Sequence, residues 1–172
     1  MADGKPEVWL RGPLPDVAPL LQPVAHSLMQ SAEEVRHHLA NATRDELWTA
    51  PGSAPSAGYH LRHATGSLDR LFTYARGEQL SRAQLDALTR ESALAGDATV
   101  DELVIAFIAA VERALAQLRA TDDARLLDAR EVGRGRLPST ALGLLFHAAE
   151  HTQRHVGQLV TTIRIVLGRQ LS

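Results

Sequence analysis

The chain has 172 residues, of which 45% are hydrophobic and 22% are charged, a balance typical of a folded globular protein and not of a disordered one. The formal net charge of −2 at pH 7 excludes the basic field that binding of nucleic acid or of an anionic membrane surface requires. Cysteine is absent, which excludes disulfides, thiolate metal ligands and a cysteine nucleophile.

The predicted location of the protein is the cytoplasm. The N-terminal residues lack the apolar core of a secretory signal. The apolar stretch LVIAFIAAV (103–111) is about half as long as a membrane-spanning helix. We therefore expect a soluble, cytoplasmic, single domain over residues 1–172, in which residues 1–13 are extended or flexible.

Alanine and leucine recur at helical spacing along the chain, whereas strand signals are almost missing. Two capping boxes, Thr43 with Glu46 and Thr99 with Glu102, mark the starts of two helices. Glycine and proline interrupt residues 121–140, which are predicted to form an irregular connection. The predicted helices cover residues 16–40, 43–48, 58–76, 81–93, 100–120 and 138–167. Four long helices with short connecting helices predict an all-α four-helix bundle.

Five of the eight histidines lie in two of the long helices: His60 and His63, and then His147, His151 and His155. On a helical wheel at about 100° per residue, His155 lies at the edge of the apolar arc of its helix. His151 lies about 40° further out and His147 about 40° beyond that, so His151 and His155 face the seam between core and cleft. His60 points further into its apolar arc than His63, but both share one side of the helix, and periodicity does not choose between them.

These histidines have two interpretations. Two imidazoles at i and i+4 can reach one metal ion at about 2.0–2.1 Å, and the helix at 58–76 can supply a third ligand. Alternatively, all are polar side chains at a bundle seam, hydrogen-bonded to carboxylates or backbone. For His26, His37 and His38 we expect only this second role, as hydrogen-bonded polar side chains. Glu150 and Asp69 are the carboxylates considered as bases, although a solvated or ion-paired role is more typical of such positions.

The two histidine-bearing segments are SAGYHLRHATGSLDRLFTYARGEQLS (56–81) and LPSTALGLLFHAAEHTQRHVGQLVTT (137–162). They resemble the two signature segments of the DinB/YfiT-like metalloenzyme superfamily, and EHTQRHVGQL is the more specific element. The resemblance implies a four-helix bundle of up-down-down-up order with three histidine ligands on one divalent metal. Carried over to this chain, it makes His63, His151 and His155 the ligands. It leaves His60 and His147 as neighbours of the site or alternative ligands.

Three neutral histidines leave a divalent ion with its full charge and an open position, which favours catalysis or ligand capture over a structural role. Zinc is expected in the cell, with nickel as the alternative in a purified sample. The resemblance implies a homodimer and a thiol S-transferase or hydrolase that acts on a small molecule, with a low-molecular-weight thiol as a partner. The alternative is a non-catalytic metal-binding or stress-response module. The sequence identifies no catalytic side chain.

Overall fold

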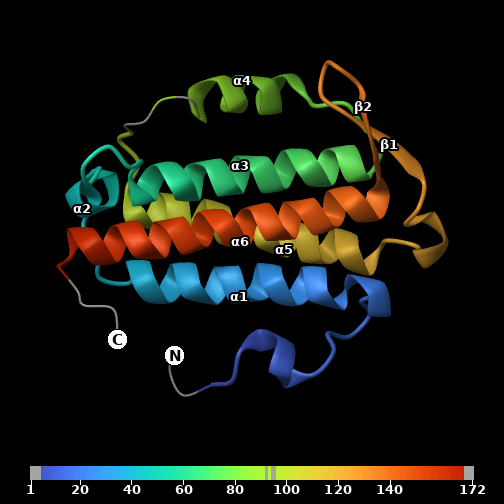
Figure 1. Ribbon diagram of the computed structural model, residues 1–172, viewed down its shortest axis with the longest axis horizontal. Helices are drawn as coiled ribbons and strands as arrows, with labels where there is room; N and C mark the ends of the chain where they lie inside the picture. The colour runs from blue at the N-terminus through green and yellow to red at the C-terminus, as the bar shows by residue number, and fades with distance from the viewer. Residues whose placement is uncertain (1–4, 92, 94–95, 169–172) are drawn as a thin grey trace.

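Helices dominate the structure, a computed structural model that describes residues 5–91, 93 and 96–168 (Figure 1). The α-helices are α1 (Gln22–Leu39), α2 (Arg44–Trp48), α3 (Ala57–Ala75), α4 (Arg82–Glu91), α5 (Val100–Arg119) and α6 (Ala141–Val166). Shorter elements are the 3-10 helices η1 (Val8–Arg11), η2 (Pro19–Leu21) and η3 (Asp123–Arg125) and the strands β1 (Ala129–Val132) and β2 (Leu137–Thr140). Every predicted helix is present; the largest difference is at the start of α1, which begins at Gln22 and not at residue 16.

The long helices α1, α3, α5 and α6 lie along one another and enclose the core (Figure 1). α6 packs against α1 and α3, and α5 packs against the same two helices. Each long helix turns an apolar face inward. The centre of the helix predicted at 100–120 is apolar almost all round, which predicts full burial, but Ile105 in α5 is 68% exposed, so only one face of α5 is buried. The large, fully buried side chains of these helices are Leu28, Leu39, Leu61, Leu68, Phe107, Leu118, Leu145, Leu159 and Ile163. Burial of this apolar surface is the main force that holds α3 against α6, the pair that carries the clustered histidines.

Both predicted capping boxes are present. The Thr43 hydroxyl accepts a hydrogen bond from the backbone N–H of Glu46 at 3.3 Å, and the Glu46 carboxylate accepts one from the Thr43 N–H at 2.7 Å. Thr99 and Glu102 repeat this exchange at the start of α5, at 3.3 and 2.8 Å. These bonds satisfy N–H groups that the first turn of a helix leaves unpaired, which is why both helices begin where the sequence predicts.

The connection between α5 and α6 differs from the prediction. Instead of an irregular segment it contains an antiparallel hairpin, in which β1 pairs with β2 and Ala129 lies opposite Thr140. Each strand has four residues, too few for an alternating pattern to stand out in the sequence. The mostly helical structure agrees with the all-α prediction, and this one short sheet is an addition to it. Pro138 belongs to β2, and α6 begins at Ala141 with Thr140 as its N-cap.

The N-terminal segment also differs from the extended or flexible conformation expected for residues 1–13. Its described part contains η1, in which Val8 is buried and donates its backbone N–H to the Gln30 side-chain oxygen at 3.0 Å. Arg11 donates to both carboxylate oxygens of Glu33, at 2.5 and 2.8 Å. These contacts attach η1 to α1. Residues 1–4 lie outside the described residues.

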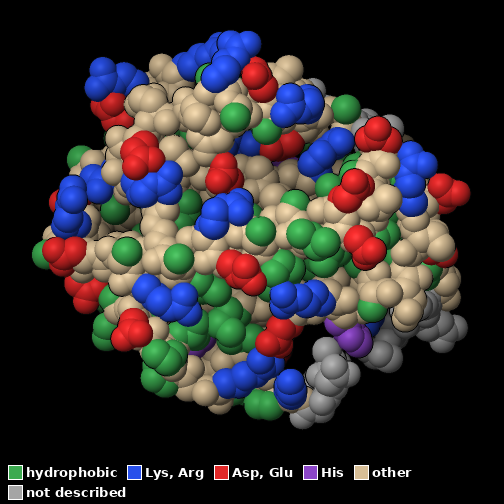
Figure 2. Space-filling view, turned by 180° about the vertical axis from the view of Figure 1, so that it is seen from behind, with side chains coloured by type: hydrophobic (Ala, Val, Ile, Leu, Met, Phe, Trp, Pro, Cys, Tyr) green, Lys and Arg blue, Asp and Glu red, His purple; other side chains and the backbone are tan. Residues whose placement is uncertain are grey.

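The surface carries no broad field of one charge on the face seen in Figure 2, where blue Lys and Arg side chains alternate with red Asp and Glu side chains. This mixture agrees with the net charge of −2. None of the helices in the described part of the chain combines the length and the apolar character that a membrane crossing needs.

Candidate metal centre

Three histidine side chains converge where α3 packs along α6. His63 comes from α3, and His151 and His155 come from successive turns of α6. One nitrogen of each ring can be chosen so that all three lie within 4.8 Å of one another. The ring centre of His155 lies 4.5 Å from that of His63 and 4.6 Å from that of His151. Two helices far apart in sequence thus present three imidazoles to one point, the set that the resemblance implies.

Buried neighbours in both helices hold this arrangement in place. Leu61 and Ala64 flank His63 in α3, and Val156 follows His155 in α6; all three are buried. These apolar side chains face the core, so the histidines beside them lie at the seam between the helices. On α6 the i, i+4 spacing places His151 and His155 on adjacent turns of one face.

The nitrogen positions fit a divalent ion. Nε2 of His63 and Nε2 of His151 are 3.0 Å apart. Two nitrogens bound to one zinc ion at about 2.0–2.1 Å are separated by about 2.9–3.4 Å, depending on the angle between the bonds. The observed separation lies in that range. Within the described residues, no other three His, Cys, Asp or Glu side chains form such a group.

Glu91, the last residue of α4, is the carboxylate that the sequence interpretation missed. Its Oε2 lies 3.4 Å from Nδ1 of His63. Arg70 donates to both of its oxygens, at 2.5 and 2.9 Å, and the Glu91 residue is only 6% exposed. A Cβ atom at Gly66 would collide with this carboxylate, so the glycine of HATGS makes room for it. In the sequence, this glycine is the only sign of the contact, and it does not identify Glu91 as the residue that fills the space.

The two carboxylates that the sequence did suggest lie elsewhere. Glu150 accepts a hydrogen bond from Arg154 at 2.6 Å and lies 2.7 Å from Nδ1 of His147. Asp69 accepts one from the side-chain amide of Gln84 at 2.6 Å. The expected ion-paired role is confirmed for Glu150, whereas Asp69 is hydrogen-bonded to a neutral amide.

His60 and His147 have different relations to the cluster. His60 is 5% exposed, which agrees with its inward position on the wheel, and its Nδ1 lies 3.1 Å from Nδ1 of His155. His147 is exposed and pairs with Glu150; its ring centre lies 5.4 Å from that of His151, but its nitrogens are not among the three that converge. Nδ1 of His151 is buried and has no hydrogen-bond partner among the described residues. His63 and His155 therefore each have a polar neighbour at Nδ1, Glu91 and His60, whereas His151 has none among the described residues.

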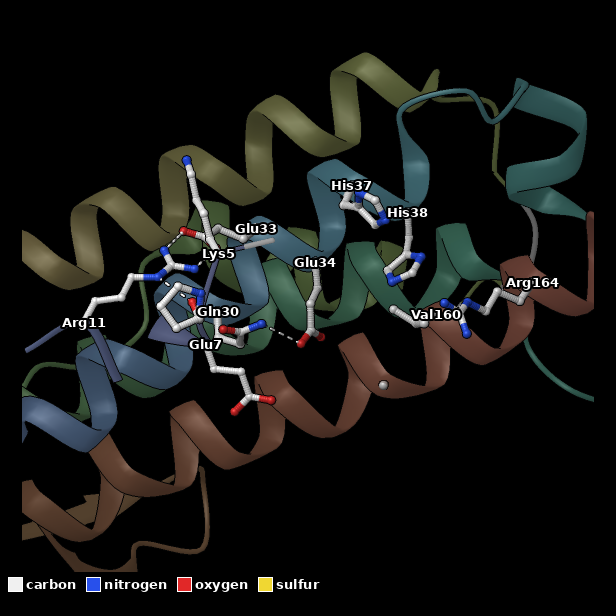
Figure 3. Close-up of a pocket in the computed structure, with 12 residues that line it drawn as sticks. Lys5, Glu7, Arg11, Gln30, Glu33, Glu34, His37, His38, Val160 and Arg164 are labelled. Carbon is white, nitrogen blue, oxygen red and sulfur yellow. Dashed lines mark hydrogen bonds and ion pairs between the residues drawn. The ribbon is translucent and has the colours of Figure 1, made fainter. Parts of the chain in front are cut away.

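The remaining histidines lie away from the cluster, as expected. Nε2 of His26 is 3.0 Å from the carbonyl oxygen of Gly12. His37 and His38 line a separate cavity of about 340 Å³ between the N-terminal segment, α1 and α6 (Figure 3). In this cavity Arg11 and Glu33 are already bound to each other.

A larger cavity of about 680 Å³ opens directly beside the cluster. His155 and His60 form part of its wall, together with Tyr59 and Arg154. The residues that complete the wall come from the loop after α2 and from the last turns of α6: Pro51, Ala54, Pro55, Gly157, Gln158, Thr161, Thr162 and Ile165. Its volume is in the range of cavities that hold small organic molecules.

Comparison with known proteins places the chain in a family. A model of the DinB superfamily matches residues 27–159, which include His63, His151 and His155. The chain belongs to the DinB superfamily. A similar solved structure is described as the conserved protein of locus from Enterococcus faecalis; it has a TM-score of 0.72 and 22% sequence identity, with 87% of this chain and 98% of that chain covered. At this identity the likeness shows a shared fold. No curated protein matches the chain.

Burial and neighbouring charge lower the pKa of two clustered histidines of this DinB-superfamily protein, His151 and His155. Burial lowers the pKa of His155 to about 4, and the positive charges of His63 and His151 act in the same direction. The pKa of His151 is lowered by burial and by the charges of His63 and His147. Burial raises the pKa of Glu91, but hydrogen bonds from His63 and Arg70 outweigh it, so the net shift is downward. The lowered pKa values of His151 and His155 favour unprotonated imidazole, the form that binds metal, and the lowered pKa of Glu91 favours its carboxylate form.

The lowered pKa of His155 predicts that the metal-free protein loses stability as the pH falls from about 6.5 to about 4. In this window the unfolded chain takes up a proton at His155 and the folded protein does not, so the free energy of unfolding decreases. Above the unfolded pKa the contribution is fully present. Urea unfolding at about pH 7 and about pH 5 measures the decrease, and the His155→Gln variant should show a smaller one. An equal decrease in both proteins would contradict the assignment.

Proposed function

We propose that this DinB-superfamily protein is a metal-dependent enzyme that binds one divalent ion through His63, His151 and His155. Its proposed reaction is thiol S-transfer or hydrolysis on a small molecule. The observation that carries the proposal is the three-histidine cluster with a cavity of about 680 Å³ at its edge. Structural zinc sites are usually closed by four protein ligands, and the group found in the described residues has three members.

A divalent ion bound there would supply a Lewis acid that lowers the pKa of a water molecule or thiol at the open position. Zinc is the proposed ion, because neutral imidazole nitrogens suit it and metal availability in the cell, more than affinity, selects the ion, with nickel as the alternative. Three neutral imidazoles bring no negative charge, so they leave the charge of the ion available to the substrate.

Side chains of the cavity would bind the substrate and limit the access of water. Tyr59, His60 and His155 all line the cavity. The Tyr59 ring is nearly parallel to the His63 ring, at 4° and 6.1 Å between centres, which restricts the orientation of His63. His60 stands behind His155 with nitrogens 3.1 Å apart and can hold the proton on Nδ1 of His155, which leaves Nε2 of His155 unprotonated.

The alternative is a non-catalytic module in which a fourth protein ligand closes the site. His60 is the nearest candidate, but its nitrogen contacts Nδ1 of His155 at hydrogen-bond distance. His147 is exposed and paired with Glu150. Neither side chain belongs to the group of converging nitrogens, and this favours the open site of an enzyme.

The test of the proposed function is a panel of electrophiles offered with several low-molecular-weight thiols, or with water alone, in the presence and absence of a chelator. We expect the chelator to remove at least about nine tenths of any turnover, and added Zn²⁺ to restore it, because the metal activates the nucleophile. The His26→Gln variant is the control and should keep wild-type turnover, since His26 contacts the Gly12 carbonyl and is not one of the converging histidines. Turnover that is insensitive to the chelator would refute the metal mechanism.

We also infer that the bundle has the up-down-down-up order of the family. Along the colour gradient of Figure 1, α1 and α6 run toward one end of the molecule and α3 and α5 run toward the other, which supports this order. The consecutive helices α3 and α5 then need a long crossover connection, and the segment that contains α4 can provide it.

A further inference from the structure

The helix α4 is attached to the bundle in an unusual way. It lies on the outside of α3 (Figure 1), and Glu91 is the only one of its 10 residues that is buried. Its two leucines, Leu85 and Leu88, are 37% and 43% exposed. Near its start, the Gln84 amide donates to the Asp69 carboxylate at 2.6 Å and to the Thr73 hydroxyl at 2.8 Å. Polar contacts therefore hold most of α4 on α3, and its one buried side chain is a carboxylate.

Burial of a carboxylate is costly unless it is paired, so the position of Glu91 requires an explanation. Arg70, itself 8% exposed, pairs with both oxygens and offsets part of this cost. A surface ion pair would not need burial, and Glu33 with Arg11 shows such a pair elsewhere in this chain. The buried position of Glu91 differs from a surface pair in that it brings Oε2 of Glu91 to 3.4 Å from Nδ1 of His63.

We propose that Glu91 is a positioning residue for the metal ligand His63, an inference that rests on the metal site of the proposed function. Its carboxylate accepts a hydrogen bond from the N–H at Nδ1 of His63, which keeps the proton on Nδ1. Nε2 of His63 is then unprotonated and faces Nε2 of His151, 3.0 Å away. Arg70 orients the carboxylate, and Gly66 leaves space for it. Such a carboxylate behind a ligating imidazole fixes the ring and makes the ligand more basic.

This arrangement couples the metal to α4, although α4 contributes no ligand. If the contact of Glu91 with His63 strengthens metal binding, metal binding must strengthen the docking of α4 by the same free energy. A helix held by few apolar contacts opens locally more easily than the bundle core, so this effect is measurable in α4.

The first test compares Glu91→Gln with Glu33→Gln, since both glutamates accept two hydrogen bonds from an arginine. Titration with Zn²⁺ should show affinity about 10–100-fold weaker for Glu91→Gln and unchanged for Glu33→Gln. The ¹⁵N chemical shifts of His63 in the metal-free proteins should show Nδ1–H in the wild type and more Nε2–H in Glu91→Gln. A purely structural role would not change this tautomer. Equal Zn²⁺ affinity in the two variants would overturn the proposal.

The second test needs no variant and applies even if Glu91→Gln does not fold. Hydrogen exchange of the wild-type amides is measured with and without Zn²⁺. Slower exchange in residues 82–91 supports the coupling, whereas protection confined to α3 and α6 refutes it. The His151→Ala variant separates the two proposals. Zn²⁺ binding retained in His151→Ala refutes the metal site itself; binding lost there but kept in Glu91→Gln refutes only the role of Glu91.

Discussion

The His63→Ala variant is expected to bind Zn²⁺ at least about 100-fold more weakly than the wild type. Removing a hydrogen-bond partner of a metal ligand weakens metal affinity roughly 10–100-fold, and removing the ligand itself should weaken it more. The His151→Ala variant should show the same loss, since the Nε2 atoms of the two residues face each other at 3.0 Å. The measurements are Zn²⁺ titration and metal analysis of the purified variants. These two substitutions test whether α3 and α6 bind one ion together.

The controls for this prediction are His26→Ala and His147→Ala. Nε2 of His26 contacts the Gly12 carbonyl, and His147 pairs with Glu150, so both variants should keep wild-type occupancy. Full occupancy in either His63→Ala or His151→Ala would show that the ligand set is wrong. Reduced metal occupancy in His147→Ala would instead show that His147 contributes to the metal site.

Replacement of Phe107 by alanine is expected to lower the free energy of unfolding by about 3–5 kcal/mol. Phe107 is the largest of the fully buried side chains, and its removal leaves a cavity where α5 packs into the bundle. This loss is a large part of the roughly 5–15 kcal/mol that stabilises a domain. Urea unfolding of the metal-free protein at about pH 7 measures it.

The matched control is Ile105→Ala in the same helix. Ile105 is 68% exposed, so its truncation should change the free energy of unfolding by less than about 0.5 kcal/mol. Similar losses in the two variants would mean that α5 does not face the core as described. Because neither residue belongs to the histidine cluster, this comparison tests the bundle independently of the metal.

Predictions from local spacing were accurate where a few consecutive residues decide the outcome. The capping boxes at Thr43 and Thr99 form because each needs only a hydroxyl and a carboxylate three residues apart. The hairpin at β1 and β2 was missed because it depends on pairing across the turn, for which four-residue strands carry little signal. Residues 92 and 94–95, near the end of the predicted helix 81–93, lie outside the described residues, and residue 93 is not helical.

The sequence by itself determined that His151 and His155 share one face of a helix, because helical periodicity places i and i+4 side by side. It also ranked His60 as more inward than His63, as their burial shows. Only the tertiary structure decided that His63 meets the pair on α6, and that Glu91 and Arg70 stand behind it. The physical reason is that contacts between distant segments depend on how the apolar faces of the helices pack, and the spacing within one helix does not specify that alignment.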